Sequence, residues 1–189
     1  GHSVHVDVKG LTPDSWYYYR FKHGSEISPV GRTRTTPELG ATMSRLVVGQ
    51  TSCANWQSGY YQLYSDLAAQ QPDYWLALGD YIYETATPAT GRVRRHSGGY
   101  VQSLAQYRAR YAQYKSDPDL QAAHACAPWM TIWDDHEVDN DYAGLQGQRM
   151  QPDFAAQRQN AYQAYWEHMP LPHRLKPDLS VPGASLNLY

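Results

Sequence analysis

The sequence lacks a long apolar segment, a strong net charge and a cysteine framework. Its 189 residues contain no apolar run near the roughly 20 residues that a membrane-spanning helix needs, and no signal peptide is recognisable. A net charge of −2 without any basic run argues against a nucleic-acid partner. The 2 cysteines allow a single disulfide, whereas small secreted domains usually carry more, so the count leaves the compartment open.

Phenylalanine is also scarce, with 2 residues against 17 tyrosines and 6 tryptophans. Aromatic rings with a polar tip suit a half-wet interior and the walls of a cleft. A length of 189 residues can bury a sizeable core, in one large domain or in one and a half ordinary ones. Because the chain begins at Gly1 without a methionine, we expect a processed or excised piece of a longer protein.

The front of the chain has the pattern of β structure. Valines alternate with polar residues over 4–8, and further strands are predicted at 16–21 and 27–35, joined by a hairpin turn. The stretch LTPDSWYYYRF resembles the tyrosine corner of immunoglobulin-like and fibronectin-type sandwiches, in which a tyrosine bonds back to the preceding turn. We therefore predict that residues 1–37 are the C-terminal strands of a β-sandwich domain, followed by a linker at 38–44.

The remainder, 45–189, alternates between strand-like and helix-like patterns, which predicts an α/β fold. A strand, a crossover helix and a second strand within about 35 residues form a βαβ unit, with parallel strands and a right-handed connection. The predicted strands are 45–50, 75–78 and 129–133, with a further strand opening at 186–189. The predicted helices are 58–71, 101–114, 119–127 and 153–168, the last of them capped by Asp153.

Two of the predicted strands end in segments of similar build. LGDYIYE places Asp80 at the end of an apolar run and Tyr83 in the same turn, and TIWDDHEV ends in paired carboxylates followed by His136. The carboxyl ends of parallel strands meet at the ligand-binding edge of an open α/β sheet, so Cys53 should join these residues there. Taken singly, each residue is more often structural, as a cap, a small buried cysteine or a solvated turn. Their recurrence at successive strand ends favours a site.

The residue types at this edge indicate metal chemistry. Carboxylates suit hard cations, and thiolate and phenolate stabilise a ferric ion, so Cys53 with Asp80 and Tyr83 favours iron over zinc. A carboxylate between two positions can bridge two metals, and two-metal sites serve phosphoryl transfer. We expect the adjacent side chains of Asp135 and His136 to diverge, which leaves the histidine free as a general acid for the leaving alkoxide. The alternatives are that His136 caps the loop or is itself a ligand.

Three stretches, SCANWQSGY, LGDYIYE and WDDHEVDNDY, resemble signature segments of the PhoD-type alkaline phosphatases, a family that includes a secreted phospholipase D. The likeness covers nearly the whole chain. It implies a layered α/β/β/α metallophosphatase sheet in a secreted enzyme. The implied activity is hydrolysis of phosphomonoesters or phosphodiesters by a metal-held hydroxide, with cleavage of phospholipid head groups as the alternative.

The resemblance also implies individual roles, with Fe3+ and Ca2+ as the cofactors and Asp80 as the bridge between them. The implied metal ligands are Cys53, Asp80, Tyr83 and Asp135; the implied catalytic residue is His136, and the implied phosphate contacts are Arg94 and Asn140. A thiolate ligand at position 53 would be incompatible with a disulfide to Cys126, and we predict that none forms.

The chain departs from the family in its extent. Family members are much longer, and their second half supplies another aspartate and a cluster of histidines. Nothing after His136 has that form, so 45–189 would be the N-terminal half of a metallophosphatase domain. A companion C-terminal fragment of the same protein would then complete the site. Without it, the chain would be an inactive binding fragment.

Overall fold

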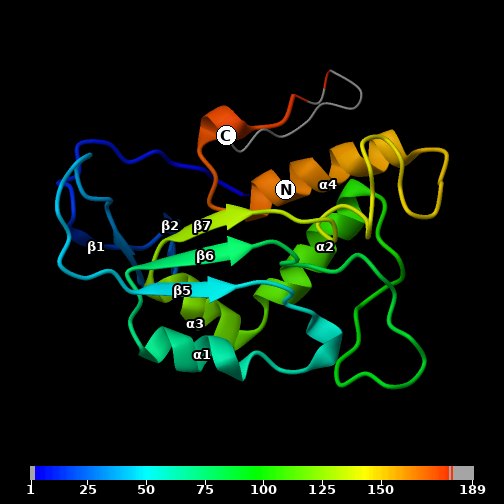
Figure 1. The fold of residues 1–189 in the computed structure, drawn as a ribbon, viewed down its shortest axis with the longest axis horizontal. Helices are drawn as coiled ribbons and strands as arrows, with labels where there is room; N and C mark the ends of the chain where they lie inside the picture. Colours follow the sequence, from blue (N-terminus) through cyan, green and yellow to red (C-terminus); the bar gives the residue numbers. More distant parts are fainter. Residues whose placement is uncertain (1–2, 179, 181–189) are drawn as a thin grey trace.

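A parallel sheet of three strands is the centre of the structure, a computed structural model that describes residues 3–178 and 180. The predicted strand at 186–189 lies outside these residues. The sheet consists of β5 (Val48–Thr51), β6 (Tyr74–Leu78) and β7 (Trp129–Ile132), in the order β5-β6-β7. Figure 1 shows the three arrows side by side and pointing the same way, with the N-terminal hairpins at the end where they begin. The predicted parallel α/β arrangement is confirmed.

The described residues form four α-helices. They are α1 (Gln62–Ala69), α2 (Leu104–Lys115), α3 (Pro118–Cys126) and α4 (Phe154–His168), with short 3-10 turns at Trp56–Ser58 and His173–Leu175. The predicted start of α3 is confirmed, because the Asp117 side chain accepts hydrogen bonds from the backbone N–H groups of Asp119 and Leu120. The predicted cap of α4 is wrong in detail, since the Asp153 side chain makes no capping hydrogen bond. None of the described helices is long and apolar enough to cross a bilayer.

The helix predicted at 58–71 is shorter than its apolar spacing suggested. Gly59 has an extended backbone, with φ of 173°, and it separates the 3-10 turn at 56–58 from α1. The 3-10 turn and α1 are therefore two separate elements and not one continuous helix. This break turns the chain after β5, so that α1 can return across the sheet.

Tryptophan and tyrosine rings make up the core on one face of the sheet. Trp75 is fully buried and stacks on Trp129, with ring centroids 5.2 Å apart. Tyr64 from α1 and His124 from α3 lie against Trp129, at 6.4 and 4.0 Å between centroids. A Cβ on Gly49 would lie 2.7 Å from the Trp75 ring, so β5 needs glycine to let this ring pass.

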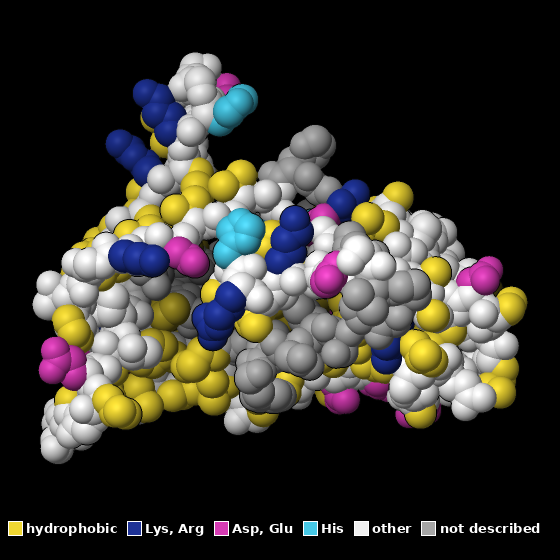
Figure 2. All heavy atoms as spheres, turned by 90° about the horizontal axis from the view of Figure 1, so that it is seen from above, with side chains coloured by type: hydrophobic (Ala, Val, Ile, Leu, Met, Phe, Trp, Pro, Cys, Tyr) yellow, Lys and Arg dark blue, Asp and Glu magenta, His cyan; other side chains and the backbone are white. Residues whose placement is uncertain are grey.

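The opposite face of the sheet is open in the described part of the chain. The strand register places Val48, Leu78 and Met130 on this face, and these side chains are 40%, 44% and 48% exposed. Figure 2, which views the molecule from above, shows hydrophobic side chains at many points of the surface. The described residues thus form one parallel sheet with helices, and they do not form the second sheet of a layered α/β/β/α arrangement.

The N-terminal part contains two small antiparallel sheets. β1 (Trp16–Tyr19) pairs with β4 (Gly31–Arg34), and β2 (Lys22–His23) pairs with β3 (Glu26–Ile27). The backbone N–H of Thr12 donates to the Tyr17 hydroxyl at 2.8 Å, which is the bond expected of a tyrosine corner. Arg32 Nε donates to the Cys126 carbonyl at 2.7 Å and ties this part to α3. A complete sandwich is not formed by the described residues.

The strand predicted at 4–8 is wrong. Val4, Val6 and Val8 are 73%, 63% and 65% exposed, and the segment pairs with no strand among the described residues. His5 instead holds it in place, with its ring stacked on Trp166 at 4.1 Å between centroids. Alternating valines form a strand only when a neighbouring strand accepts their backbone bonds, and the described chain offers none here.

Candidate metal centre

The ends of β6 and β7 approach each other at Gly79. This residue has φ of 92°, and a Cβ added to it would lie 2.5 Å from the backbone nitrogen of Asp134. Only glycine combines this left-handed backbone with so close a contact. This close contact places Asp80, which follows Gly79, beside Asp135, which follows Asp134.

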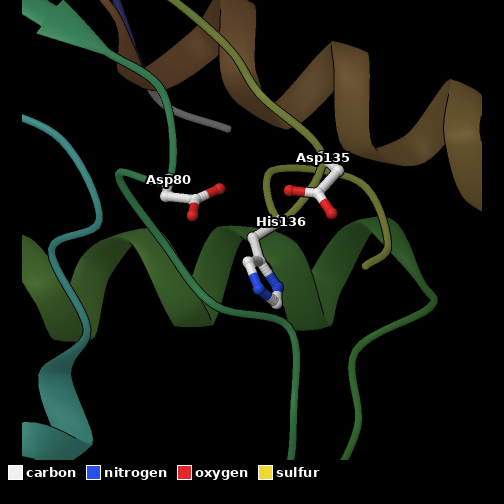
Figure 3. Close-up of side chains that lie close together, drawn as sticks. All are labelled: Asp80, Asp135 and His136. Carbon is white, nitrogen blue, oxygen red and sulfur yellow. The ribbon is translucent and has the colours of Figure 1, made fainter. Parts of the chain in front are cut away.

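Three of the predicted site residues come together at this point. Asp80, Asp135 and His136 each offer one potential ligand atom, and these atoms all lie within 4.8 Å of one another. Figure 3 shows the two carboxylates pointing toward each other, with the His136 ring beside them. The expectation that Asp135 and His136 diverge is therefore wrong. A turn directly after the strand, in which the Asp135 carbonyl accepts from the N–H of Val138, rotates the pair to one side.

Tyr83 and Cys53 lie at the border of this cluster. The Tyr83 hydroxyl donates to Asp80 Oδ2 at 3.0 Å. Burial, then the charge of Asp80 and the nearby Cys53 thiol, raise the pKa of the Tyr83 phenol. Cys53 is exposed at the end of β5, and its N–H donates to the Gly79 carbonyl at 3.2 Å. Cys53 and Asp80 both have positive φ, 54° and 55°, a strained conformation that is frequent at functional sites.

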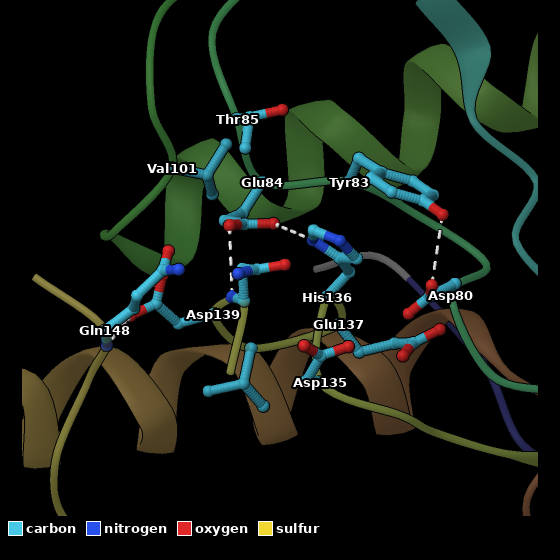
Figure 4. A network of polar contacts seen from close by, with 12 residues as sticks. Asp80, Tyr83, Glu84, Thr85, Val101, Asp135, His136, Glu137, Asp139 and Gln148 are labelled. Atoms are coloured by element: carbon cyan, nitrogen blue, oxygen red, sulfur yellow. Dashed lines mark hydrogen bonds and ion pairs between the residues drawn. The ribbon is translucent and has the colours of Figure 1, made fainter. Parts of the chain in front are cut away.

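Two buried glutamates, which the sequence patterns did not single out, join the loops after β6 and β7. Glu84, in the first loop, accepts from His136 Nδ1 at 2.8 Å and from the Asn140 N–H at 3.2 Å (Figure 4). Glu137, in the second loop, accepts from the N–H of Tyr81 in the first and from its own loop. Each is 1% exposed. Each glutamate thus binds groups in the loop that carries the other one, and we call Glu84 and Glu137 together the glutamate clasp.

The cluster concentrates negative charge, with Asp80 buried, Asp135 half-buried and Asp134 exposed. Burial, then the charges of Asp135 and Asp80, raise the pKa of Asp134. Burial alone would lower the pKa of His136, but the hydrogen bond and charge of Glu84 outweigh it, so that the pKa is raised. Asp80 is 6% exposed, and its Oδ1 has no hydrogen-bond partner. A buried carboxylate oxygen without a donor, next to a second carboxylate, fits a bound cation.

The structure does not bring Arg94 to this cluster. Its guanidinium pairs with Asp117 at 2.6 Å, lies 3.6 Å from the Trp56 ring centroid and donates from Nε to the Trp56 carbonyl. The side chain of Arg94 is 8% exposed and pairs with a buried aspartate, and its contact with phosphate stays a prediction. Asn140 lies beside the cluster, where its side-chain amide donates to Asp141 at 2.8 Å.

Both cysteines are free, in agreement with the prediction that they do not form a disulfide. The Cys126 thiol lies at the end of α3, accepts from Trp75 Nε1 at 3.4 Å and donates to the Ala123 carbonyl. Cys53, in contrast, lies at the carboxyl end of β5. The two thiols thus belong to opposite ends of the sheet.

Fold and site together define an α/β protein with a candidate metal centre at the carboxyl edge of its parallel sheet. Residues 46–189 match the family model of the PhoD-like phosphatases, and residues 1–37 match the model of the PhoD-like phosphatase N-terminal domain. The chain therefore belongs to the PhoD-like phosphatase family.

Two individual proteins illustrate the relationship. The chain is 45% identical, over 195 residues, to alkaline phosphatase D of Bacillus subtilis (strain 168), covering 100% of this chain and 33% of that protein. It is also similar to a solved structure described as "Structure of PhoD", with a TM-score of 0.90 and 44% identity, covering 97% of this chain and 36% of the other. The chain thus spans about a third of the length of these relatives.

Proposed function

We propose that this chain is the metal-binding, N-terminal part of a secreted phosphoesterase that hydrolyses phosphomonoesters, phosphodiesters or both. The observation that carries the proposal is the pair of Asp80 and Asp135 at the sheet edge, with a buried Asp80 oxygen that lacks a hydrogen-bond donor. Similarity to a protein named alkaline phosphatase D supports the reaction class. Secretion rests on the resemblance to the family.

The donor set suits two different ions. Cys53 and Tyr83 would bind Fe3+, Asp80 would bridge Fe3+ and Ca2+, and Asp135 would add an oxygen ligand. Bound metal ions would supply Lewis-acid activation of water and charge neutralisation at phosphorus. The hydrogen bond from the Tyr83 hydroxyl to Asp80 supports this assignment, because it holds the oxygen atoms of both potential metal ligands close together.

His136 would move the proton. Glu84 accepts the hydrogen bond of His136 Nδ1, which fixes the ring and leaves Nε2 for proton transfer. The raised pKa of His136 keeps a larger share of the ring protonated near neutral pH, as donation to a leaving alkoxide requires. Asn140 would contact the phosphate from the same loop, and the glutamate clasp would keep both loops in register.

Completion of the site would come from a companion C-terminal segment of the same protein. The exposed apolar side chains of Val48, Leu78 and Met130 support this part of the proposal, since an open sheet face of this kind needs a cover. The same segment would supply the metal ligands that the described residues do not provide.

Metal analysis of the chain tests the proposal. After reconstitution with Fe3+ and Ca2+ and removal of excess ions, we expect bound metal in the wild type and its loss in Asp80→Asn. The matched control is Asp66→Asn, an exposed aspartate of α1. Metal content in Asp80→Asn equal to that of the control would contradict the assignment. If the metal-loaded chain cleaves no phosphoester even with its C-terminal companion, the chain would instead be an inactive fragment that only binds metal.

A further inference from the structure

A cavity lies between the N-terminal hairpins and the helices, at the ends of α2 and α3. It has a volume of about 360 Å³. Its lining residues are Tyr19, Pro29, Val30, Gly31, Lys115, Gln121, His124 and Ala125. This cavity shares no lining residue with the candidate metal centre, and none of its lining residues is acidic.

Lys115 lines this cavity, and its ammonium group has no matching negative charge among the described residues. Its Nζ donates to the carbonyl of His168, at the end of α4, and lies 5.8 Å from the ring centroid of Tyr81. In the described part of the chain, no carboxylate forms an ion pair with it. Burial lowers the pKa of Lys115 to about 8, which reflects the cost of holding this ammonium group away from water.

The neighbouring imidazoles do not add to the charge. Burial, then the charge of Lys115, lower the pKa of both His124 and His168, the latter to about 4. His124 is fixed by a hydrogen bond of 2.7 Å between its Nε2 and the Tyr81 hydroxyl, and His168 stacks on Tyr111. The cavity therefore holds one cation, set among neutral rings.

Most of the remaining wall is apolar, and Gln121, whose side-chain amide donates to the Lys115 carbonyl, is its polar member. The Tyr19 ring lies over Gly31, where an added Cβ would be 2.4 Å from the ring, and Val30 is 55% exposed. Pro29 and Ala125 add further apolar surface. A volume of about 360 Å³ lies at the lower end of small-ligand sites, which are mostly apolar with few polar groups that fix orientation.

We propose that this cavity is a binding site for a small organic anion, with a carboxylate paired to Lys115 and an aromatic or short acyl body against Tyr19 and Val30. The anion supplies the charge that the chain does not provide at Lys115. Its apolar body removes the exposed surface of Val30 and the Tyr19 ring from water. An ion without such a body makes only the first contact, so we expect the site to prefer benzoate to inorganic phosphate.

Calorimetric titration of the 189-residue chain with benzoate tests the site. We expect saturable binding at one site, and binding of the neutral analogue benzyl alcohol at least tenfold weaker. Lys115→Met keeps the apolar stem and removes the charge, so it should weaken benzoate binding at least tenfold. Lys22→Met, at an exposed lysine of β2, is the matched control and should leave binding unchanged.

A second variant keeps the test decisive if Lys115→Met does not fold. Val30→Trp fills the cavity from an exposed position and should abolish benzoate binding while the circular dichroism spectrum stays that of the wild type. Three results would overturn the proposal: no benzoate binding, equal binding of benzoate and benzyl alcohol, or equal binding in the wild type and both variants. Inorganic phosphate bound as tightly as benzoate would also overturn it, because the apolar wall would then have no role.

Discussion

Two groups of charged residues in the described part of the chain differ in how their charge is balanced. Arg94 and Asp117 form an ion pair of 2.6 Å, with both side chains less than 10% exposed and the aspartate also capping α3. Asp80 and Asp135 are brought together with like charge, and Asp80 Oδ1 has no hydrogen-bond partner. The first cluster neutralises itself, whereas for the second we propose that a bound cation supplies the balancing charge.

This difference separates a structural charge from a functional one. A paired buried charge contributes to stability only through the cost of breaking the pair. A cluster of like charges costs stability and persists when the surrounding fold imposes it, here through the glutamate clasp and the contact of Gly79 with Asp134. Charge balance within a cluster is therefore more informative than the presence of charged residues near a motif.

Removing Arg94 should have the largest effect on stability. Arg94→Ala leaves Asp117 buried without its cation and exposes the Trp56 ring, so we expect a loss of about 3–5 kcal/mol in the free energy of unfolding. Urea denaturation measures this loss. Arg94→Lys should recover only part of it, because lysine cannot both pair with Asp117 and stack on Trp56. A stable Arg94→Ala protein that has lost phosphate binding would instead support the predicted contact between Arg94 and phosphate.

Removing His136 should affect turnover rather than folding. In the chain completed by its C-terminal companion, His136→Ala should lower turnover of an alkyl phosphoester by roughly two to four orders of magnitude. The loss should be smaller for a nitrophenyl ester, whose leaving group hardly needs a proton. Steady-state assays with both substrates, together with metal analysis, provide the measurement. Equal losses for the two substrates, or loss of metal, would show that His136 is not the acid.

His96, a buried histidine near Arg110, should have a smaller effect on stability, and this effect should depend on pH. Burial, then the charge of Arg110, lower the pKa of His96 to about 4, while an unfolded histidine titrates near 6.5. The folded state thus binds fewer protons, and stability should fall as the pH decreases from about 6.5 to 4. We expect this ring to account for on the order of 1–2 kcal/mol of the decrease.

The matched variant for this titration is His96→Gln. Its amide can keep a hydrogen bond to the Tyr114 hydroxyl but cannot take up the proton. Urea denaturation at several pH values should therefore give a flatter stability profile between pH 4 and 6.5. If the stability of His96→Gln depended on pH as that of the wild type does, groups other than His96 would cause the loss of stability in acid.

Much of the fold could be predicted because its signals are local. The apolar run at 75–78 and the Asp117-Pro118 pair each specify an element within a few residues, and the structure has both. The strand at 4–8 could not be judged in this way, because a strand depends on a partner elsewhere in the chain. The pairing of Arg94 with Asp117 could not be predicted for the same reason, since Asp117 lies 23 residues further on and meets Arg94 only after folding.

For the site, too, features set by nearby residues could be predicted, and features set by residues distant in the sequence could not. The ends of β6 and β7 indicated that Asp80 and Asp135 would meet, because parallel strands share an edge. The divergence expected of His136 failed because the turn after β7 is set by hydrogen bonds and not by the alternation of a strand. The glutamate clasp was missed because each partner lies more than fifty residues away in the sequence.

Unfolding with and without a cation tests the central contrast between the two clusters most directly. In chelator, we expect Asp80→Asn to be no less stable than the wild type, because one of two like charges is removed, and Asp117→Asn to be clearly less stable. Ca2+ at about 100 times its dissociation constant should stabilise the wild type and Asp117→Asn by about 2.7 kcal/mol each and should not stabilise Asp80→Asn. Equal stabilisation of all three proteins by Ca2+ would contradict the account.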